Sequence, residues 1–436
     1  MHATTIKRSQ VLHIAWPIIL SNLSIPLLGL VDTAVIGNLG DASLLGAIAV
    51  GAVIFSFIYW GFGFLRMGTT ALVAQAVGGN QQKEASAVFY RAAIIGAAIG
   101  LILITVQIPI AAAAFGLLSG STAVEEAAQA YFTIRIMGAP FSLALLAVMG
   151  YLLGVQATRT VLLLNIILNG LNIILDLIFV LGFGWGVEGV ALATVLAEIT
   201  ALSAGFVVIW PRLRAAGVVP AKVILRASEL KRMLVVNRDI MIRTLCLIFA
   251  FAWFTNQGAS QGDIILATNA ILMQFVTFAA FFLDGFALAA ETLIGAAVGA
   301  RNHNRMNQSI RYVFELGAGT ALVLSGLFWL SGGWLIDLLT NVEAVREASR
   351  TFLWWAVLAP VISVWCYLLD GIFIGATRTP EMRNAMIVSL LAYLGLWWVA
   401  VPPFGNHGLW LALHGYFIAR ALSLAYYLPR IMRQLH

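Results

Sequence analysis

Four polar residues inside apolar stretches have the types and spacing to bind a small cation. Asp32 lies in PLLGLVDTAVIG, Asn172 and Asp176 lie four apart in NGLNIILD, and Thr194 lies in a third apolar run. Four-residue spacing places Asn172 and Asp176 on one face of a helix. Two carboxyl groups confined together are costly to charge at once, so one would hold a proton. Alternatively, the carboxylate, amide and hydroxyl oxygens would hold Na⁺, and either chemistry makes these four residues an ion-coupling site.

The composition shows what kind of element must position these residues. Of the 436 residues, 61% are hydrophobic and 10% are charged, whereas soluble domains carry about 25% charged residues. A membrane helix needs roughly 20 mostly apolar residues. The sequence therefore predicts an all-α, polytopic membrane protein with twelve transmembrane helices. The predicted spans are 11–37, 44–77, 85–118, 124–155, 158–182, 187–210, 232–256, 264–298, 307–336, 344–375, 382–402 and 407–429.

The basic residues predict the orientation of these spans. If the N-terminus is cytoplasmic, nearly all Lys and Arg outside the spans fall in cytoplasmic segments; Arg346 and Arg350 are the exceptions. Such a bias is the positive-inside rule, and it accounts for the net charge of +6 without a nucleic-acid partner. We therefore expect a multi-pass protein of the inner (plasma) membrane with both termini in the cytoplasm.

The two halves of the chain resemble each other. AVGGNQQ is similar to AVGARNH, ATRT at 157–160 recurs at 376–379, and GVEGVALA is similar to GNHGLWLA, each about 220 residues later. An even number of spans separates the copies, so both halves have one orientation, as in transporters with parallel repeats. We expect an N-lobe at 1–211, a cytoplasmic basic linker at 212–230 and a C-lobe at 231–436. Six-helix lobes around a central cavity favour a moving, monomeric transporter over a scaffold or channel.

The candidate ion-coupling residues come from three spans but lie at one depth. Asp32, Asp176 and Thr194 are each about five to seven residues from the outer end of their span, or roughly 8–12 Å at 1.5 Å per residue. Interhelical hydrogen bonding is the alternative role for Asn172 and Thr194. The matched depth of the two aspartates favours a functional site.

Further polar residues in the spans are candidates for contact with a substrate or the cavity. They are Glu198, one turn beyond Thr194, together with Asp284 and Asp370 in the second half. His414 is expected to be a hydrogen-bonded packing residue. The histidines lack metal-binding spacing, and we expect no cofactor and no metal other than possible Na⁺.

Pro26 is the candidate hinge of the first span. A proline inside a helix removes one backbone hydrogen bond. Because Pro26 lies about two turns before Asp32, bending there could follow protonation of that carboxyl group. A static kink is the alternative.

Three segments resemble the multidrug and toxic compound extrusion (MATE) family, and most closely its DinF-like branch. They are PLLGLVDTAVIG around Asp32, NGLNIILD around Asp176 and WCYLLDGIFIGATR around Asp370. The resemblance implies twelve helices, a V-shaped cavity between two lobes and drug export driven by H⁺ or Na⁺. Many members of another branch pair a glutamate in span seven with the aspartate of span ten. Here 244–255 contains no acidic residue, which moves the expected ion site to the N-lobe.

The sequence therefore predicts a secondary active multidrug efflux antiporter that exports amphipathic or cationic compounds in exchange for H⁺, or alternatively Na⁺. A lipid-linked precursor flippase, or another ion-coupled exporter of the same superfamily, remains the alternative. Such flippases often have a basic cavity, whereas few basic residues lie within these spans: Arg66, Arg135, Arg243 and Arg420. The loop GGNQQKE does not fit a major-facilitator transporter. The chain lacks a nucleophile constellation and a nucleotide-binding motif, so we expect no enzymatic activity.

Overall fold

The computed structural model describes residues 6–37, 42–117 and 121–433, and over these residues the chain is helical without strands. The first half contains α1 (Arg8–Gly37), α2 (Ala42–Gly61), α3 (Phe64–Gly78), α4 (Gln82–Thr105), α5 (Gln107–Leu117), α6 (Thr122–Ile136), α7 (Ala139–Gly154), α8 (Thr158–Asp176), the π-helical segment η1 (Leu177–Gly182) and α9 (Gly186–Ala216). The second half contains α10 (Ala221–Ile224), α11 (Ala227–Ala259), α12 (Asp263–Gly299), α13 (His303–Leu339), α14 (Glu343–Gly375), α15 (Thr379–Phe404) and α16 (Asn406–Arg433).

These elements confirm an all-α, polytopic membrane fold. Among the described residues, ten helical stretches are long and apolar enough to cross a membrane, and the pair α6–α7 adds an eleventh if it is one span. We assign the remaining predicted span, 232–256, to α11, whose 33 residues reach about 50 Å at the helical rise. The expected linker at 212–230 is itself partly helical, since α9 continues to Ala216, α10 follows and α11 begins at Ala227.

Short interruptions break several of the predicted runs. Gly61 ends α2 and Gly63 precedes α3, so one predicted span consists of two helices. A 53° bend separates α6 from α7, with Gly138 between helices and Pro140 in the first turn of α7. Proline is tolerated at a helix start because the N–H groups of the first turn have no intrahelical acceptor.

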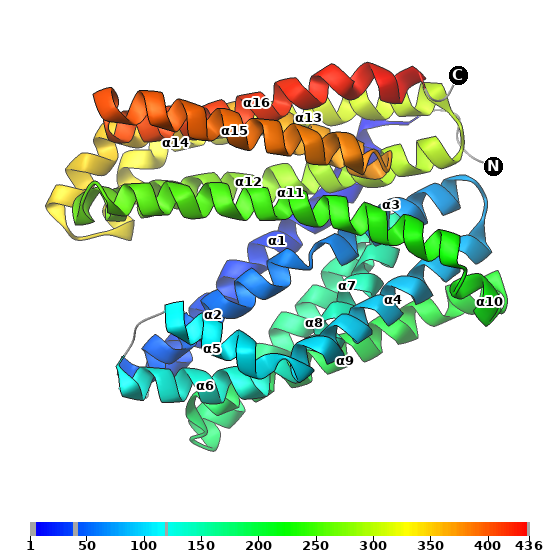
Figure 1. The fold of residues 1–436 in the computed structure, drawn as a ribbon, viewed down its shortest axis with the longest axis horizontal. Helices are drawn as coiled ribbons and strands as arrows, with labels where there is room; N and C mark the ends of the chain where they lie inside the picture. The colour runs from blue at the N-terminus through cyan, green and yellow to red at the C-terminus, as the bar shows by residue number, and fades with distance from the viewer. Residues whose placement is uncertain (1–5, 38–41, 118–120, 434–436) are drawn as a thin grey trace. The chain divides into compact units, whose positions relative to one another are not determined.

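The chain divides into two compact units, which are described separately (Figure 1). Unit 1 comprises Met1–Ile19 and Arg238–His436, and unit 2 comprises Leu20–Asn237. The division falls inside α1 and inside α11. In unit 2, α7 packs against α3 and α4; in unit 1, α14 packs against α12 and α13, and α15 against α16. The expected lobes, 1–211 and 231–436, rest on the internal repeat and stay a prediction.

Equivalent turns occur in both units. Asn80 after α3 and Arg301 after α12 have positive φ, as do Gln156 after α7 and Thr377 after α14. Each turn has the same three backbone hydrogen bonds to the end of the preceding helix, a Schellman-type arrangement. Both pairs are 221 residues apart, from 80 to 301 and from 156 to 377. The two ATRT copies are 219 residues apart (157 to 376), so this sequence match lies two residues out of structural register.

The same 221-residue spacing relates two close helix crossings. A Cβ added to Gly150 of α7 would lie 2.7 Å from the carbonyl oxygen of Arg66 in α3. A Cβ added to Gly371 of α14 would lie 2.1 Å from the carbonyl oxygen of Ala287 in α12. Small residues let membrane helices approach closely, and here each crossing tolerates no side chain.

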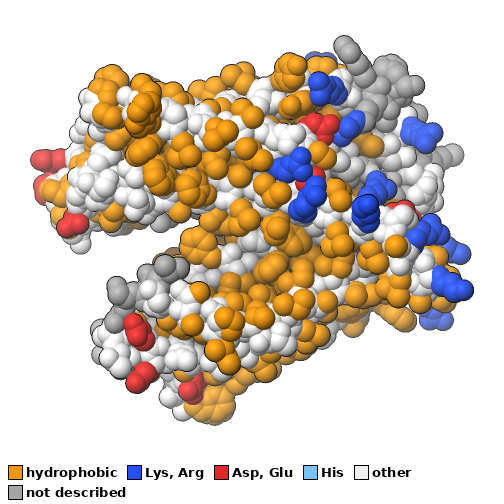
Figure 2. All heavy atoms as spheres, in the orientation of Figure 1, with side chains coloured by type: hydrophobic (Ala, Val, Ile, Leu, Met, Phe, Trp, Pro, Cys, Tyr) orange, Lys and Arg blue, Asp and Glu red, His pale blue; other side chains and the backbone are white. Residues whose placement is uncertain are grey.

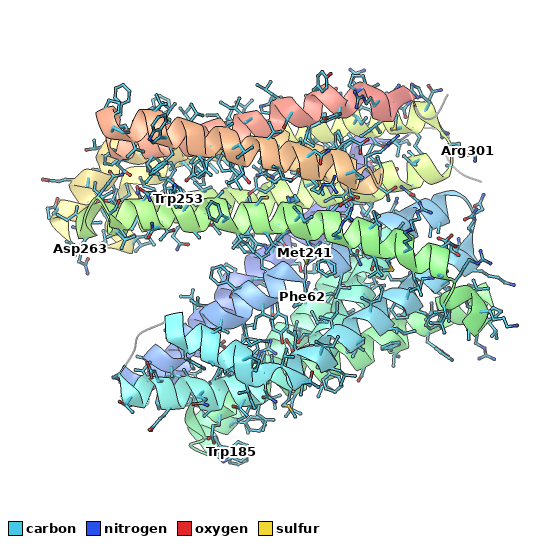
Figure 3. All side chains as sticks on the ribbon, in the orientation of Figure 1. Phe62, Trp185, Met241, Trp253, Asp263 and Arg301 are labelled. Atoms are coloured by element: carbon cyan, nitrogen blue, oxygen red, sulfur yellow. The ribbon has the colours of Figure 1, made fainter. Side chains whose placement is uncertain are left out.

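Charged side chains gather at the ends of each unit (Figure 2). In unit 2, the exposed Lys83 and Lys222 lie at the start of α4 and in α10, and the exposed Glu125 and Glu188 lie at the starts of α6 and α9. In unit 1, Asp263 and Arg301 lie at opposite ends of α12 (Figure 3). Exposed apolar side chains cover the helices between these ends, as a bilayer requires.

The two exceptions to the positive-inside pattern have acidic partners. Arg350 forms an ion pair with Asp337 at 2.5 Å, and Arg346 lies 3.4 Å from Glu343 and 3.7 Å from Asp337. These two arginines therefore add little net positive charge to their end of unit 1.

Candidate functional site

A polar seam joins α1 to α8 within unit 2. The amide of Asn165 donates to the hydroxyl of Ser21, and Nδ2 of Asn169 donates to Oγ of Ser24 at 2.8 Å. The α8 residues 165, 169, 172 and 176 are four or three positions apart, so they share one helical face. The seam therefore leads along this face towards Asp176.

The outer part of the seam brings together all four predicted ion-coupling residues. The carboxyl groups of Asp32 and Asp176 approach each other within hydrogen-bonding range. The amide of Asn172 lies 3.0 Å from Oγ1 of Thr194. Its best-satisfied orientation has the amide nitrogen donating to Oδ2 of Asp176 at 3.1 Å and the amide oxygen accepting from the backbone N–H of Thr194 at 3.1 Å. Asp32 is half-buried, whereas Asn172 and Asp176 are buried.

Asp176 is the last α-helical residue before a change of helix type. The next six residues, Leu177–Gly182, are π-helical. Such segments are rare and frequently occur at functional sites. The apolar sequence of η1 carries no glycine or proline signal before Gly182, so sequence analysis missed it.

Glu198 forms a buried ion pair with Arg135 of α6. Nη2 and Nη1 of Arg135 lie 2.6 and 2.9 Å from the two carboxylate oxygens, and Ser142 donates its hydroxyl to the same carboxylate. The guanidinium also stacks on the rings of Phe55 and Tyr59, at 5.2 and 5.0 Å from their centroids. Glu198, a sequence-based cavity candidate, is therefore fully engaged by protein groups.

The comparisons with known proteins identify the family. The MatE family model matches residues 17–178 and 240–399, one segment in each half of the chain. The chain belongs to the MatE family. It is 41% identical to DNA damage-inducible protein F of Escherichia coli K12, with 95% of this chain and 90% of that protein covered, which confirms the DinF-like resemblance. The family consists of transporters, so the protein is a transporter and not an enzyme.

Other MatE relatives are more distant. The chain is 24% identical to NorM of Acinetobacter baylyi, named a probable multidrug resistance protein, over 93% of this chain and 92% of that one. An outward-facing multidrug resistance MATE transporter has a TM-score of 0.89 at 18% identity, with 98% and 97% of the chains covered. A MOP superfamily transporter from Pyrococcus furiosus gives 0.88 at 19%, with 97% and 96% covered. These structures establish the shared fold.

Unit 1 of this MatE protein contains a second buried ionic cluster. Asp370 of α14 accepts from Nη2 of Arg420 in α16 at 2.6 Å and also from Arg243 in α11. All three side chains are buried. The sequence offers no acidic partner for Asp370 in 244–255 and does not show its two basic partners, because an arginine within a span gives no sign of which helix it meets. Asp370 is thus held by protein cations.

The remaining candidates occupy separate places. Asp284 is half-buried on α12 in unit 1, and it does not belong to the unit 2 site. His414 is a buried packing residue whose ring nitrogens lie 3.0 and 3.1 Å from the carbonyl oxygens of Trp410 and Trp355. Pro26 is exposed, and α1 continues through it as one helix. Among the described residues no group of three or more His, Cys, Asp and Glu side chains could hold a metal ion.

Proposed function

We propose that this MatE transporter is a secondary active antiporter that exports amphipathic or cationic organic compounds in exchange for protons. The observation that carries the proposal is the close approach of the Asp32 and Asp176 carboxyl groups. The names of relatives, which include multidrug resistance proteins, support this class of substrate.

A direct hydrogen bond between two carboxyl groups needs a proton. An ionised carboxylate only accepts hydrogen bonds, whereas a protonated one has an O–H donor. The arrangement of Asp32 and Asp176 therefore matches a pair that shares at least one proton. Loss of that proton would leave two negative charges facing each other, which favours recapture of a proton or binding of a cation.

The contacts of Asn172 favour H⁺ over Na⁺. A sodium cage would use the oxygens of this amide and of Thr194 along with the carboxylates. In its best-satisfied orientation, Asn172 points its nitrogen at Asp176 and its oxygen at the backbone of Thr194. An N–H group aimed at a carboxylate supports a negative charge there but repels a cation.

The helix α1 provides a route from the ion site to the rest of the chain. It carries Asp32 and Pro26 within unit 2, and its first residues, up to Ile19, belong to unit 1. We propose that protonation of Asp32 changes the bend of α1 at Pro26, since the proline weakens the helix there. Such bending would couple proton binding to alternating access between two lobes. Each lobe is formed by one repeat, and the segment 212–230 links them.

The charge distribution supports the proposed topology. On the face shown in Figure 2, the Lys and Arg side chains gather towards one end of each unit and the opposite end shows Asp and Glu, while Arg346 and Arg350 have acidic partners. We propose an inner-membrane protein with both termini in the cytoplasm. Both repeats lie in one chain, so a monomer has all the proposed parts.

Transport in proteoliposomes tests the proposal. The purified protein is reconstituted, and uptake of a fluorescent organic cation is measured under a pH gradient alone and then under a Na⁺ gradient alone. We expect uptake under the pH gradient, and release of protons that depends on substrate. Asp32→Asn should abolish both, because an amide cannot bind and release the proton.

The matched control is Thr33→Val on the same helix. Thr33 is exposed, and its hydroxyl bonds only the carbonyl of Gly29 in the preceding turn. The Thr33→Val variant should transport the organic cation at the wild-type rate. Uptake driven only by Na⁺ would refute proton coupling. Normal uptake by Asp32→Asn would refute the ion-coupling site at Asp32. The absence of cation uptake under either gradient would favour the alternative, a lipid-linked precursor flippase.

A further inference from the structure

An apolar groove runs along the surface of unit 1, between the first turns of α1 and the helices α12 and α13. Its volume is about 570 Å³. Trp16 of α1, Phe278 and Phe282 of α12, and Leu327 of α13 are among the residues that line it. Its floor is fixed by the packing of α1 on α12, where a Cβ added to Gly285 would lie 2.4 Å from Ile19.

One end of the groove is charged. Glu315, which lines it, accepts from Arg8 of α1 at 2.7 Å and from Arg311 of α13 at 2.7 Å. Arg8 also stacks over Tyr312 at 5.3 Å. Both arginines are exposed, with 61% and 73% of their side chains accessible. One carboxylate balances only one of the two guanidinium groups, so this cluster of Arg8, Arg311 and Glu315 keeps a positive charge.

The dimensions of the groove fit one leaflet of a bilayer. Its α13 lining extends from Glu315 to Leu327, which is about 18 Å at the helical rise. Half of a hydrocarbon core of about 30 Å is about 15 Å. The charged end lies at the start of α1, on the side where basic residues gather.

We propose that this groove binds an anionic glycerophospholipid of the cytoplasmic leaflet. The acyl chain lies along the aromatic side chains, and the phosphate group lies at the guanidinium groups of Arg8 and Arg311. Basic residues at this level attract anionic headgroups, and an aromatic-lined groove holds a chain better than a flat helix face does. The inference is independent of the proposed antiport, since it uses none of the unit 2 residues.

Gly319 offers a sharp test of the groove. It lies on α13 within the lining, and a Cβ added there meets nothing within 4 Å. Gly319→Leu should therefore fold normally and fill the space of the acyl chain. Gly333→Leu is the matched control, because Gly333 is on the same helix, is equally open and is outside the lining.

The experiment is native mass spectrometry of the full-length protein titrated with dioleoyl phosphatidylglycerol or dioleoyl phosphatidylcholine. We expect the wild type to retain one phosphatidylglycerol in preference to phosphatidylcholine. Arg311→Gln should reduce that preference about fivefold, because each basic residue near the membrane surface contributes about 1 kcal/mol of attraction to anionic lipid. Gly319→Leu should reduce retention of both lipids at least tenfold, and Gly333→Leu should leave it unchanged.

Other outcomes overturn the inference. Equal retention of the two lipids, or unchanged retention by Gly319→Leu, would show that the groove is not a phospholipid site. Retention of a fluorescent organic cation there, lost in Gly319→Leu while lipid binding persists, would instead make it an entry route for substrate. Arg311→Gln leaves the groove intact and tests the headgroup contact separately.

Discussion

The buried ion pair between Arg135 and Glu198 makes a prediction that separates a structural role from a substrate-binding role. Two contacts of 2.6 and 2.9 Å join the side chains, which are 8% and 9% exposed. Solvent therefore screens the pair little. Removing one partner of such a pair typically costs about 3–5 kcal/mol, because the other charge stays buried.

We expect Arg135→Met to lower the free energy of unfolding by about 3 kcal/mol or more. Ser142 still donates to Glu198 after this change, which places the cost near the lower end of the range. Glu198→Gln should cost about 2 kcal/mol, since the amide oxygen can still accept from the guanidinium group, whose stacking on Phe55 and Tyr59 remains. The double variant Arg135→Met/Glu198→Leu should recover most of the loss, because an apolar pair of similar volume often replaces a buried ion pair at little cost.

The assay is a double-mutant cycle of unfolding free energies in detergent micelles, with Arg135→Met, Glu198→Leu and their double variant, and Glu198→Gln is measured beside it. A coupling energy of about 3 kcal/mol would show that Glu198 is committed to Arg135 and is not free to meet a substrate. Strictly additive single effects would refute this reasoning. In that case Glu198 would remain a cavity residue, and Glu198→Gln should change the KM for the organic cation without changing stability.

Two further predictions concern α1 and α14. Pro26→Ala should stabilise the protein by up to about 3 kcal/mol, the usual cost of a proline inside a helix. The same change should slow transport about tenfold or more while substrate binding is retained. Transport at the wild-type rate would identify Pro26 as a static kink. Gly371→Ala should destabilise by about 1–3 kcal/mol or prevent folding, because its Cβ would lie 2.1 Å from the carbonyl oxygen of Ala287. Gly395→Ala, where a Cβ meets nothing within 4 Å, should be neutral or stabilising in thermal unfolding, and equal behaviour of the two variants would contradict the close crossing.

The sequence by itself determined the fold class and most of the span positions. Lipid offers no hydrogen bonds, so every span must satisfy its own backbone and present apolar side chains. Both requirements are local and can be read from a run of about 20 residues. The same local rule marked Asp32, Asn172, Asp176 and Thr194, because polar residues in such runs are rare. The four- and three-residue spacing of Asn165, Asn169, Asn172 and Asp176 was also available and could have revealed the seam with α1.

Only the tertiary structure decided which charges meet. Whether Arg135 reaches Glu198, or Arg243 and Arg420 reach Asp370, depends on how each helix is rotated about its axis and where it crosses its neighbours. Residues far apart in sequence set these angles, including Gly150 and Gly371 at the two close crossings. The backbone geometry of the two turns also made Gln156 equivalent to Thr377, which corrected the register suggested by the identical ATRT strings. A sequence match records shared residues, whereas structural equivalence follows the backbone hydrogen bonds that end each helix.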